Sequence, residues 1–195
     1  MTKRDITRND LLSRDEYIAV RPERKRLISE LKKNRRVSVG PDSTFYFESF
    51  DTMLHQVQEM LYIERGGEDQ IDDELSAYNP LIPNGRELVA TLMFEIDEPV
   101  RRGEFLAGLG GVEHTITINL DGETITAVPE QDVERTTAEG KASSIHFLHL
   151  PFTETQAKKF KNPKTDVTLG IGHKKYGHIA MVSDVVREAL AADFD

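Results

Sequence analysis

The sequence predicts an α+β protein in which N-terminal helices and a short C-terminal helix pack against an antiparallel or mixed β-sheet. Apolar residues recur at helical spacing in the N-terminal part, whereas most later segments alternate between apolar and polar residues, as strands do. Helices followed by hairpin-connected strands are typical of α+β proteins rather than doubly wound ones. The 195 residues contain no linker-like tract, so we expect a single domain over residues 1–195.

Helices are expected where apolar periodicity coincides with capping residues. Leu27, Ile28 and Leu31 keep helical spacing in the first helix, in which Pro22 marks a first-turn position or a break. A terminal helix is capped by Ser183. The first helix is expected at residues 15–34. Further helices are expected at 51–65 with a cap at Gly66–Gly67, at 68–77, and shortly after Pro151.

Strands are expected in the remaining segments. Residues 36–48 contain two short strand-like runs around a turn at residues 40–42, which predicts a hairpin. Both alternating sets of residues 88–95 are largely apolar, as in a central strand covered on both faces. Further strands are expected at residues 144–150, 166–171 and 178–182.

A second hairpin is predicted around Asp121–Gly122. Residues 112–120 alternate as a strand with one wet face does, and the two-residue turn then reverses the chain. This register pairs Leu120 with Glu123 and Ile118 with Ile125. The apolar side chains of both strands therefore fall on one face of the hairpin.

Composition and charge exclude several classes of protein. The chain has 34 acidic and 25 basic residues, a net charge of −9, whereas duplex nucleic acid requires a basic footprint. Because there is no cysteine, disulfides, thiolate zinc sites and iron–sulfur ligation are excluded. No apolar run reaches the roughly 20 residues of a membrane-spanning helix, and no secretory signal follows the charged start. A cytoplasmic protein without a membrane partner is expected.

The positive charge is concentrated in residues 21–36, which contain eight basic and two acidic side chains. One interpretation is a solvated helix face; the other is a docking patch for an acidic partner or a phosphate-bearing ligand. The rigid loop at residues 78–85, with two prolines and an Asn–Gly turn, offers Tyr78 as a further contact. The candidate docking residues are Arg21, Arg24, Lys25, Arg26, Arg35, Arg36 and Tyr78.

Carboxylates in the helix at 51–65 suggest a polar site. At 100° per residue, Glu64 falls within the apolar stripe of Met53 and Val57, and Glu59 lies on a second stripe. A buried carboxylate must be paired, hydrogen-bonded or bound to a metal. Either these acids pair with an arginine such as Arg35 or Arg36 or cap backbone amides of a neighbouring loop, or they form a carboxylate site with Glu48 and Glu95.

Histidines supply possible partners for that site. His146 and His149 lie three apart on a strand and point to opposite faces. His173 and His178 flank a turn and are expected to face each other, while His114 is expected on the apolar face of its strand. Such oxygen and nitrogen donors suit iron, manganese or zinc. The candidate metal or polar site comprises Glu48, Glu59, Glu64, His114, His146, His173 and His178.

Several runs of the sequence resemble one uncharacterised bacterial family. They are RRVSVGP at residues 35–41, FE at 47–48, QVQEMLYIE at 56–64, YNPLIP at 78–83 and IHF at 145–147. On these residues the chain resembles the domain-of-unknown-function family DUF3501 over nearly its whole length. The genes of that family are often neighbours of rubrerythrin and of an iron–sulfur oxidoreductase. The resemblance therefore implies a role beside a peroxide- or oxygen-responsive system, with Glu48, Glu59 and Glu64 as candidate family residues.

Two functions remain open from the sequence. The first is an accessory or binding protein that docks a rubrerythrin-type or iron–sulfur redox partner in the oxidative-stress response. The alternative is a small metal-dependent enzyme, or a metal- or haem-binding protein, that uses the Glu/His site. A nucleic-acid binder is supported only by the local basic patch. The familiar phosphate-loop, dinucleotide, zinc-protease and nucleophile-elbow motifs are absent, so the sequence does not decide whether the protein is an enzyme.

Overall fold

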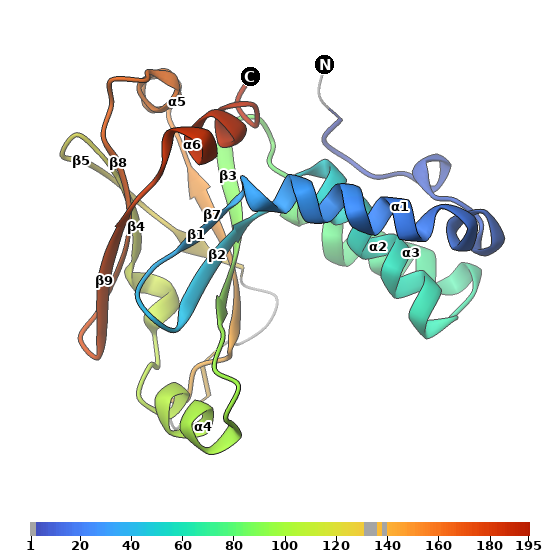
Figure 1. Cartoon of the computed structure of the whole chain (residues 1–195), viewed down its shortest axis with the longest axis horizontal. Helices are drawn as coiled ribbons and strands as arrows, with labels where there is room; N and C mark the ends of the chain where they lie inside the picture. The colour runs from blue at the N-terminus through green and yellow to red at the C-terminus, as the bar shows by residue number, and fades with distance from the viewer. Residues whose placement is uncertain (1–2, 131–135, 138–139) are drawn as a thin grey trace.

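The computed structural model describes residues 3–130, 136–137 and 140–195, and it consists of two antiparallel sheets with a helical arm at one side (Figure 1). All strand pairs among the described residues are antiparallel, and the combination of helices with these sheets confirms the predicted α+β class. The division of the strands between two sheets was not predicted. None of the described helices is both long and apolar enough to cross a membrane.

Sheet A has the order β1-β2-β3-β7-β6, and sheet B the order β5-β4-β8-β9. The strands of sheet A are β1 (Arg36–Ser38), β2 (Ser43–Phe47), β3 (Glu87–Phe94), β6 (Val128–Pro129) and β7 (Ile145–Pro151). Those of sheet B are β4 (Ile116–Leu120), β5 (Glu123–Thr126), β8 (Val167–His173) and β9 (Tyr176–Met181).

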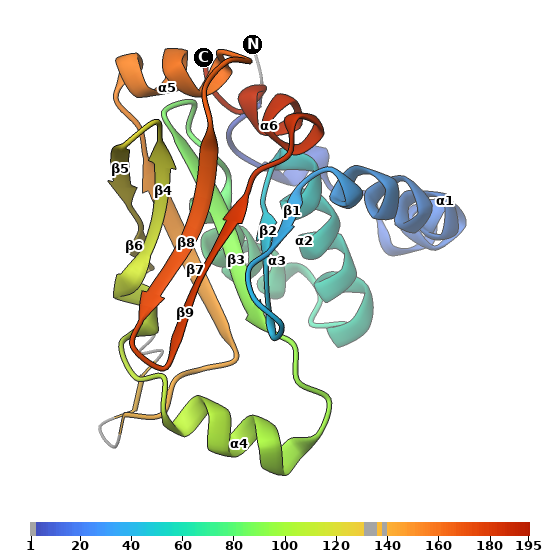
Figure 2. The same cartoon turned by 60° about the vertical axis from the view of Figure 1, so that its left-hand side comes forward.

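The helical arm comprises the three helices α1 (Arg14–Lys33), α2 (Phe50–Glu64) and α3 (Glu68–Tyr78), which project away from the sheets (Figure 1). The other helices are α4 (Pro99–Ala107), α5 (Glu154–Lys161) and α6 (Asp184–Ala191). Figure 2 shows α5 and α6 at one end of the two sheets and α4 at the opposite end. We call the sheets with these three helices the body.

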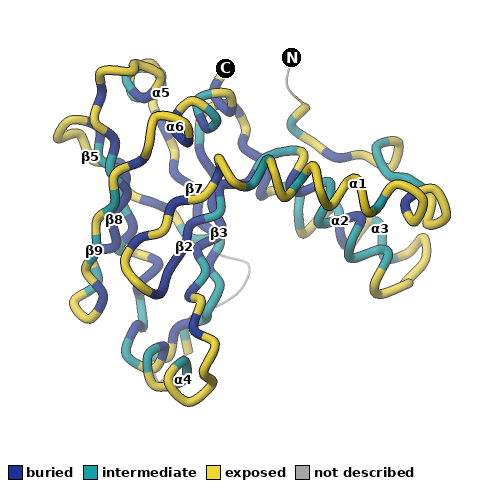
Figure 3. Tube along the Cα trace, in the orientation of Figure 1, coloured by how far each residue is buried: buried dark blue, intermediate teal, exposed yellow. Residues whose placement is uncertain are grey.

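Two hydrophobic clusters lie on opposite faces of sheet A. Leu88, Ala90 and Leu92 of β3 face the cluster between the two sheets, which is the core of the body. Val89 faces the other way and packs with Met53 and Val57 of α2 in the smaller cluster of the arm. Strand β3 is therefore covered on both faces, as predicted. In Figure 3, β2 and β3 are largely buried, whereas much of α1 is exposed.

Both predicted hairpins are confirmed. Strands β1 and β2 pair across the turn at residues 39–42, and Leu120 pairs with Glu123 in the β4–β5 hairpin. Asp121 and Gly122 both have positive φ, 46° and 89°, as the favoured two-residue hairpin turns require. Ser183 caps α6 by accepting a hydrogen bond from the Val186 amide.

Two local predictions are wrong, and one helix was missed. The strand expected from residue 112 begins only at Ile116, because Gly111, with φ of 78°, starts a 3-10 helix at Val112–Thr115. Pro22 lies inside α1, where the carbonyl of Ile18 loses its helical donor; Ile18 is exposed, so water can take that place. Helix α4 was not predicted, although Pro99 at its first position and Glu98 as its cap are ordinary start signals.

Candidate functional site

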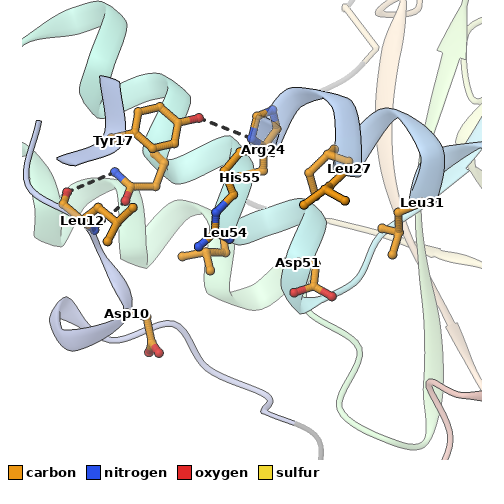
Figure 4. A pocket seen from close by; sticks show the side chains of 11 residues that line it. Asp10, Leu12, Tyr17, Arg24, Leu27, Leu31, Asp51, Leu54 and His55 are labelled. Atoms are coloured by element: carbon orange, nitrogen blue, oxygen red, sulfur yellow. Dashed lines mark hydrogen bonds between the residues drawn. The ribbon is translucent and has the colours of Figure 1, made fainter. Parts of the chain in front are cut away.

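A pocket lies between α1, α2 and the N-terminal segment, which we define as residues 3–13 (Figure 4). Its volume is about 240 Å³. The apolar lining residues are Leu12, Leu27, Ile28, Leu31 and Leu54, and the polar ones are Asp10, Tyr17, Arg24, Asp51, His55 and Gln58. The pocket thus has apolar walls and charged groups of both signs around them.

The spacing of residues on α1 creates one wall. Arg24, Leu27, Ile28 and Leu31 follow the i, i+3, i+4, i+7 pattern and share one helix face. Leu27 keeps 49% of its surface exposed although it lines the pocket. An apolar side chain is therefore available to a ligand at the mouth of the pocket.

The opposite wall is held in place by two side-chain amides. Gln58 accepts a hydrogen bond from the Leu12 amide at 2.6 Å and donates to the Leu12 carbonyl at 3.4 Å. Asn79 does the same with Ile6, at 2.8 and 3.0 Å. Each amide thus satisfies both backbone groups of one residue in the N-terminal segment. Sequence reasoning missed this role, although both amides lie in the runs QVQEMLYIE and YNPLIP.

Beside the pocket, Glu59 joins α2 to α1. Arg21 donates from Nε and Nη2 to the two carboxylate oxygens at 2.7 and 2.8 Å, and the Tyr17 hydroxyl donates to Oε1 at 2.7 Å. The hydrogen bonds from Arg21 lower the pKa of Glu59 to about 2, even though burial opposes this. Burial and the neighbouring Glu59 raise the pKa of Tyr17. Glu59 is therefore ionised and Tyr17 protonated near neutral pH.

His55 extends this network to the pocket. Its Nδ1 lies 3.4 Å from the Tyr17 hydroxyl, which can accept a hydrogen bond because its own proton goes to Glu59. Burial lowers the pKa of His55, and the charges of Lys32 and Lys25 add to this effect, while Glu59 opposes it. The pocket is thus lined by an imidazole that is neutral near pH 7.

The three predicted carboxylates do not come together. Glu48 is buried and accepts hydrogen bonds from the hydroxyls of Thr52 and Thr91, both at 2.6 Å. Glu59 has paired with Arg21 rather than with Arg35 or Arg36.

The prediction that Glu64 lies within the apolar stripe is wrong. Its helix ends at this residue, so the packed face stops one turn earlier. Glu64 is exposed and accepts a hydrogen bond from Gln70 at 2.8 Å.

The histidines are also separate. His146 is fully buried, with Nε2 2.9 Å from the Ser143 carbonyl and Nδ1 3.8 Å from Glu113. His114 is exposed, which contradicts its expected place on an apolar face, because it lies in the 3-10 helix rather than in a strand. Within the described ranges, no three His, Asp or Glu side chains are grouped so that they could hold a metal ion.

His173 and His178 do not face each other as expected. The turn between β8 and β9 contains only Lys174 and Lys175, so His173 pairs with Tyr176 and His178 pairs with Ile171. The ring of His178 instead packs against Tyr176, with centroids 4.4 Å apart.

The docking candidates divide into two groups. Arg35 is buried, which contradicts a docking role: it donates to the carbonyls of Phe47 and Glu48 and pairs with Asp193. Arg21 is bound to Glu59, and Tyr78 is half-buried. The exposed candidates are Arg24, Lys25, Arg26 and Arg36, of which Arg26 pairs with Glu23.

One ionic group was not predicted. His149 lies between two carboxylates, with Nδ1 3.1 Å from Glu87 and Nε2 2.9 Å from Glu130. Hydrogen bonding to Glu87, with a further contribution from Glu130, raises the pKa of His149 although burial opposes it. His146 and His149 do point to opposite faces of β7, as expected. No periodic signal in the sequence links His149 to Glu87 or Glu130.

Comparison with known proteins supports the resemblance stated above. No curated protein matches the chain. A crystal structure of a protein of unknown function from Burkholderia pseudomallei K96243 is 34% identical, covers 100% of both chains and has a TM-score of 0.90. A family model described as a protein of unknown function, DUF3501, matches residues 5–194. The chain therefore belongs to the DUF3501 family.

Proposed function

We propose that the protein is an accessory protein that binds a partner protein at the pocket of the helical arm. The observation that carries this proposal is the arrangement on α1, where the cation of Arg24 and the exposed side chain of Leu27 lie together at an apolar pocket. Exposed apolar side chains beside charged ones are typical of interaction sites. The volume of about 240 Å³ suits one large apolar side chain of the partner.

The charge on α1 favours an acidic partner. In the described part of the chain, Arg24, Lys25 and Lys32 form no ion pair. The chain as a whole has a net charge of −9, so these cations stand out from an acidic background. Charge complementarity of this kind accelerates and orients association. The partner surface should therefore present an apolar side chain flanked by carboxylates.

The family resemblance suggests which partner to test. Because related genes often lie beside those of rubrerythrin and an iron–sulfur oxidoreductase, we propose that the partner is one of these redox proteins. This would place the protein in the cytoplasmic response to oxidative stress. The arm would recognise the partner, while the redox chemistry would belong to the partner's own cofactor.

The experiment measures binding of the purified chain to a rubrerythrin and to an iron–sulfur oxidoreductase from the same organism. The double variant Arg24→Glu, Lys25→Glu should weaken binding by about tenfold or more, and added salt should weaken the binding of the unaltered protein. Lys164→Glu is the matched control, since Lys164 is exposed on the body and has no ion pair among the described residues. Equal affinity of the double variant and the control would contradict the proposal.

Metal analysis separates this proposal from a metal-dependent function. The untagged protein would be purified without chelator and measured by elemental analysis and absorption spectroscopy. Iron, manganese or zinc near one equivalent, or a haem band, would favour the metal- or haem-binding alternative. Loss of that metal in Glu48→Gln or His146→Gln, with the fold intact, would then locate the site.

A further inference from the structure

Strand β9 is an edge strand with free hydrogen-bonding groups. It is the last strand of sheet B and pairs only with β8 in the part of the chain that is described (Figure 2). The Val182 amide donates to the Val167 carbonyl at 2.9 Å, which sets the alternation of the ladder. The backbone groups of Ala180, His178 and Tyr176 therefore form hydrogen bonds with β8. The residues whose N–H and C=O point to the free edge are Gly177, Ile179 and Met181.

The same strand exposes apolar side chains. Ile179 is 76% exposed and Met181 is 61% exposed, and no charged residue or proline lies within Tyr176–Met181. Proteins usually protect such an edge, because an uncharged strand with free backbone groups pairs with other chains. An unprotected edge of this kind indicates that another strand covers it.

The other three sheet edges carry protection. Strand β1 has three residues and begins with the exposed Arg36. Strand β5 begins with Glu123, and β6 ends with Pro129. These are the features that prevent edge-to-edge pairing. The absence of protection is thus a property of β9 and not of the sheets in general.

The sequence of β9 is complementary to itself. In an antiparallel pair centred on Ile179, this residue lies opposite Ile179 of the second copy, and Gly177 lies opposite Met181. These are the residues whose backbone groups are free, so each such pair exchanges two hydrogen bonds. Gly177 has no side chain and leaves room for the methionine, while the two isoleucines bury each other.

The segments just before and just after β9 carry opposite charges. Lys174 lies in the turn before β9, and Asp184 is the first residue of α6 after it, so an antiparallel pair brings the end of the strand beside Lys174 next to the end beside Asp184 of the second copy. Both residues are exposed, and Asp184 already pairs with Arg187 at 3.0 Å on its own helix. The register therefore brings opposite charges together rather than like ones.

We propose that a second copy of this chain covers β9, so that two copies of sheet B form one continuous sheet across a two-fold axis at Ile179. Such an isologous contact uses the same surface on both copies and closes on itself. The face of β9 that carries Tyr176 is covered by the body and is not available for this contact. The Tyr176 hydroxyl donates a hydrogen bond to the Val39 carbonyl and accepts one from the Asp42 amide. The proposal concerns the body and is independent of the pocket on the arm.

The first test measures the mass of the full chain in solution by sedimentation velocity over the micromolar range. The unaltered protein should sediment as a dimer of the 22.1 kDa chain. Ile179→Lys should weaken the dimer by about tenfold or more, because two like charges then meet at the axis. Val100→Lys on α4 is the matched control, since Val100 is 67% exposed and belongs to a helix rather than to β9.

The second test fixes the register. The chain has no cysteine, so Ile179→Cys introduces a unique thiol at the proposed axis. Directly opposed residues of this kind have Cα atoms about 5.5 Å apart, which is within the range that a disulfide spans. Mild oxidation should join two Ile179→Cys chains but leave Val100→Cys chains unjoined. A monomeric unaltered protein, a dimer insensitive to Ile179→Lys, or equal crosslinking of both cysteine variants would overturn the proposal.

Discussion

Arg21 and Glu59 join α1 to α2 through two hydrogen bonds from one guanidinium group, at 2.7 and 2.8 Å. Arg21→Met should lower the free energy of unfolding, because it removes both hydrogen bonds and leaves Glu59 without its cation. Urea unfolding at neutral pH measures this. Arg26→Met should lower it less, because the pair that Arg26 forms with Glu23 is exposed. Equal costs would contradict the structural role of Arg21.

The pair of Arg21 and Glu59 predicts that the stability of the protein falls in acid. The pKa of Glu59 is lowered from 4.5 to about 2 in the folded protein, so its stabilising effect is fully present above 4.5. That effect is lost as the pH falls from 4.5 towards 2. Urea unfolding at several pH values should therefore show a smaller loss of stability in acid for Arg21→Met than for the unaltered protein. Parallel profiles for the two proteins would indicate that Glu59 does not titrate in this way.

His149 should show the opposite pH dependence. Its pKa is raised above the ordinary 6.5 by the hydrogen bond to Glu87 and by Glu130. The resulting stabilisation is fully present below 6.5 and is lost as the pH rises through the pKa of the folded protein. An NMR titration of the histidine ring should locate this pKa above 6.5, and Glu130→Gln should lower it. No change in Glu130→Gln would show that Glu130 does not contribute.

The two glutamates Glu48 and Glu64 should differ in their effect on stability. Glu48→Ala leaves the buried hydroxyls of Thr52 and Thr91 without this acceptor, which should cost about 1–3 kcal/mol. Glu64→Ala removes an exposed side chain and should change stability by less than about 0.5 kcal/mol. Thermal and urea unfolding of both variants provide the measurement. A large loss of stability in Glu64→Ala would contradict the exposed position of this carboxylate.

Arg35 and Arg36 form a second contrasting pair. Arg35→Met leaves Asp193 buried without its cation, and breaking a buried pair in this way typically costs about 3–5 kcal/mol. Arg36→Met on the exposed side of β1 should be nearly neutral. The additional change Asp193→Asn should recover part of the loss in Arg35→Met. If it recovers none, the destabilisation comes from the carbonyl contacts of Arg35 instead.

Much of the fold was predictable because it depends on local patterns. The alternation of residues 88–95 and the dipeptide Asp121–Gly122 determine which faces are buried and where the chain turns, and both predictions are confirmed. The failures have local causes as well. Gly111 redirects the chain into a 3-10 helix, and the turn at Lys174 is shorter than the sequence suggested.

The site was less predictable because its contacts link distant residues. Nothing in the spacing of Arg21 and Glu59 indicates that they meet, and Arg35 and Asp193 are separated by 158 positions. Gln58 and Asn79 bind the main chain of the N-terminal segment, which leaves no periodic signal. A count of charges along the sequence also does not distinguish a buried arginine such as Arg35 from an exposed one such as Arg36. The identity of the partner and the single-domain organisation over residues 1–195 stay predictions.

The position of sheet A between two hydrophobic clusters has a consequence for local unfolding. The cluster of the arm is much smaller than that of the body. Val89 belongs to the arm's cluster, whereas Leu88, Ala90 and Leu92 on the opposite face of the same strand belong to the body's cluster. The arm can therefore open as a separate cooperative unit while the body keeps its core. Amide hydrogens of α1 and α2 should exchange with solvent faster than those of β3, and a protein bound at the pocket should slow exchange in the arm without changing it in the body.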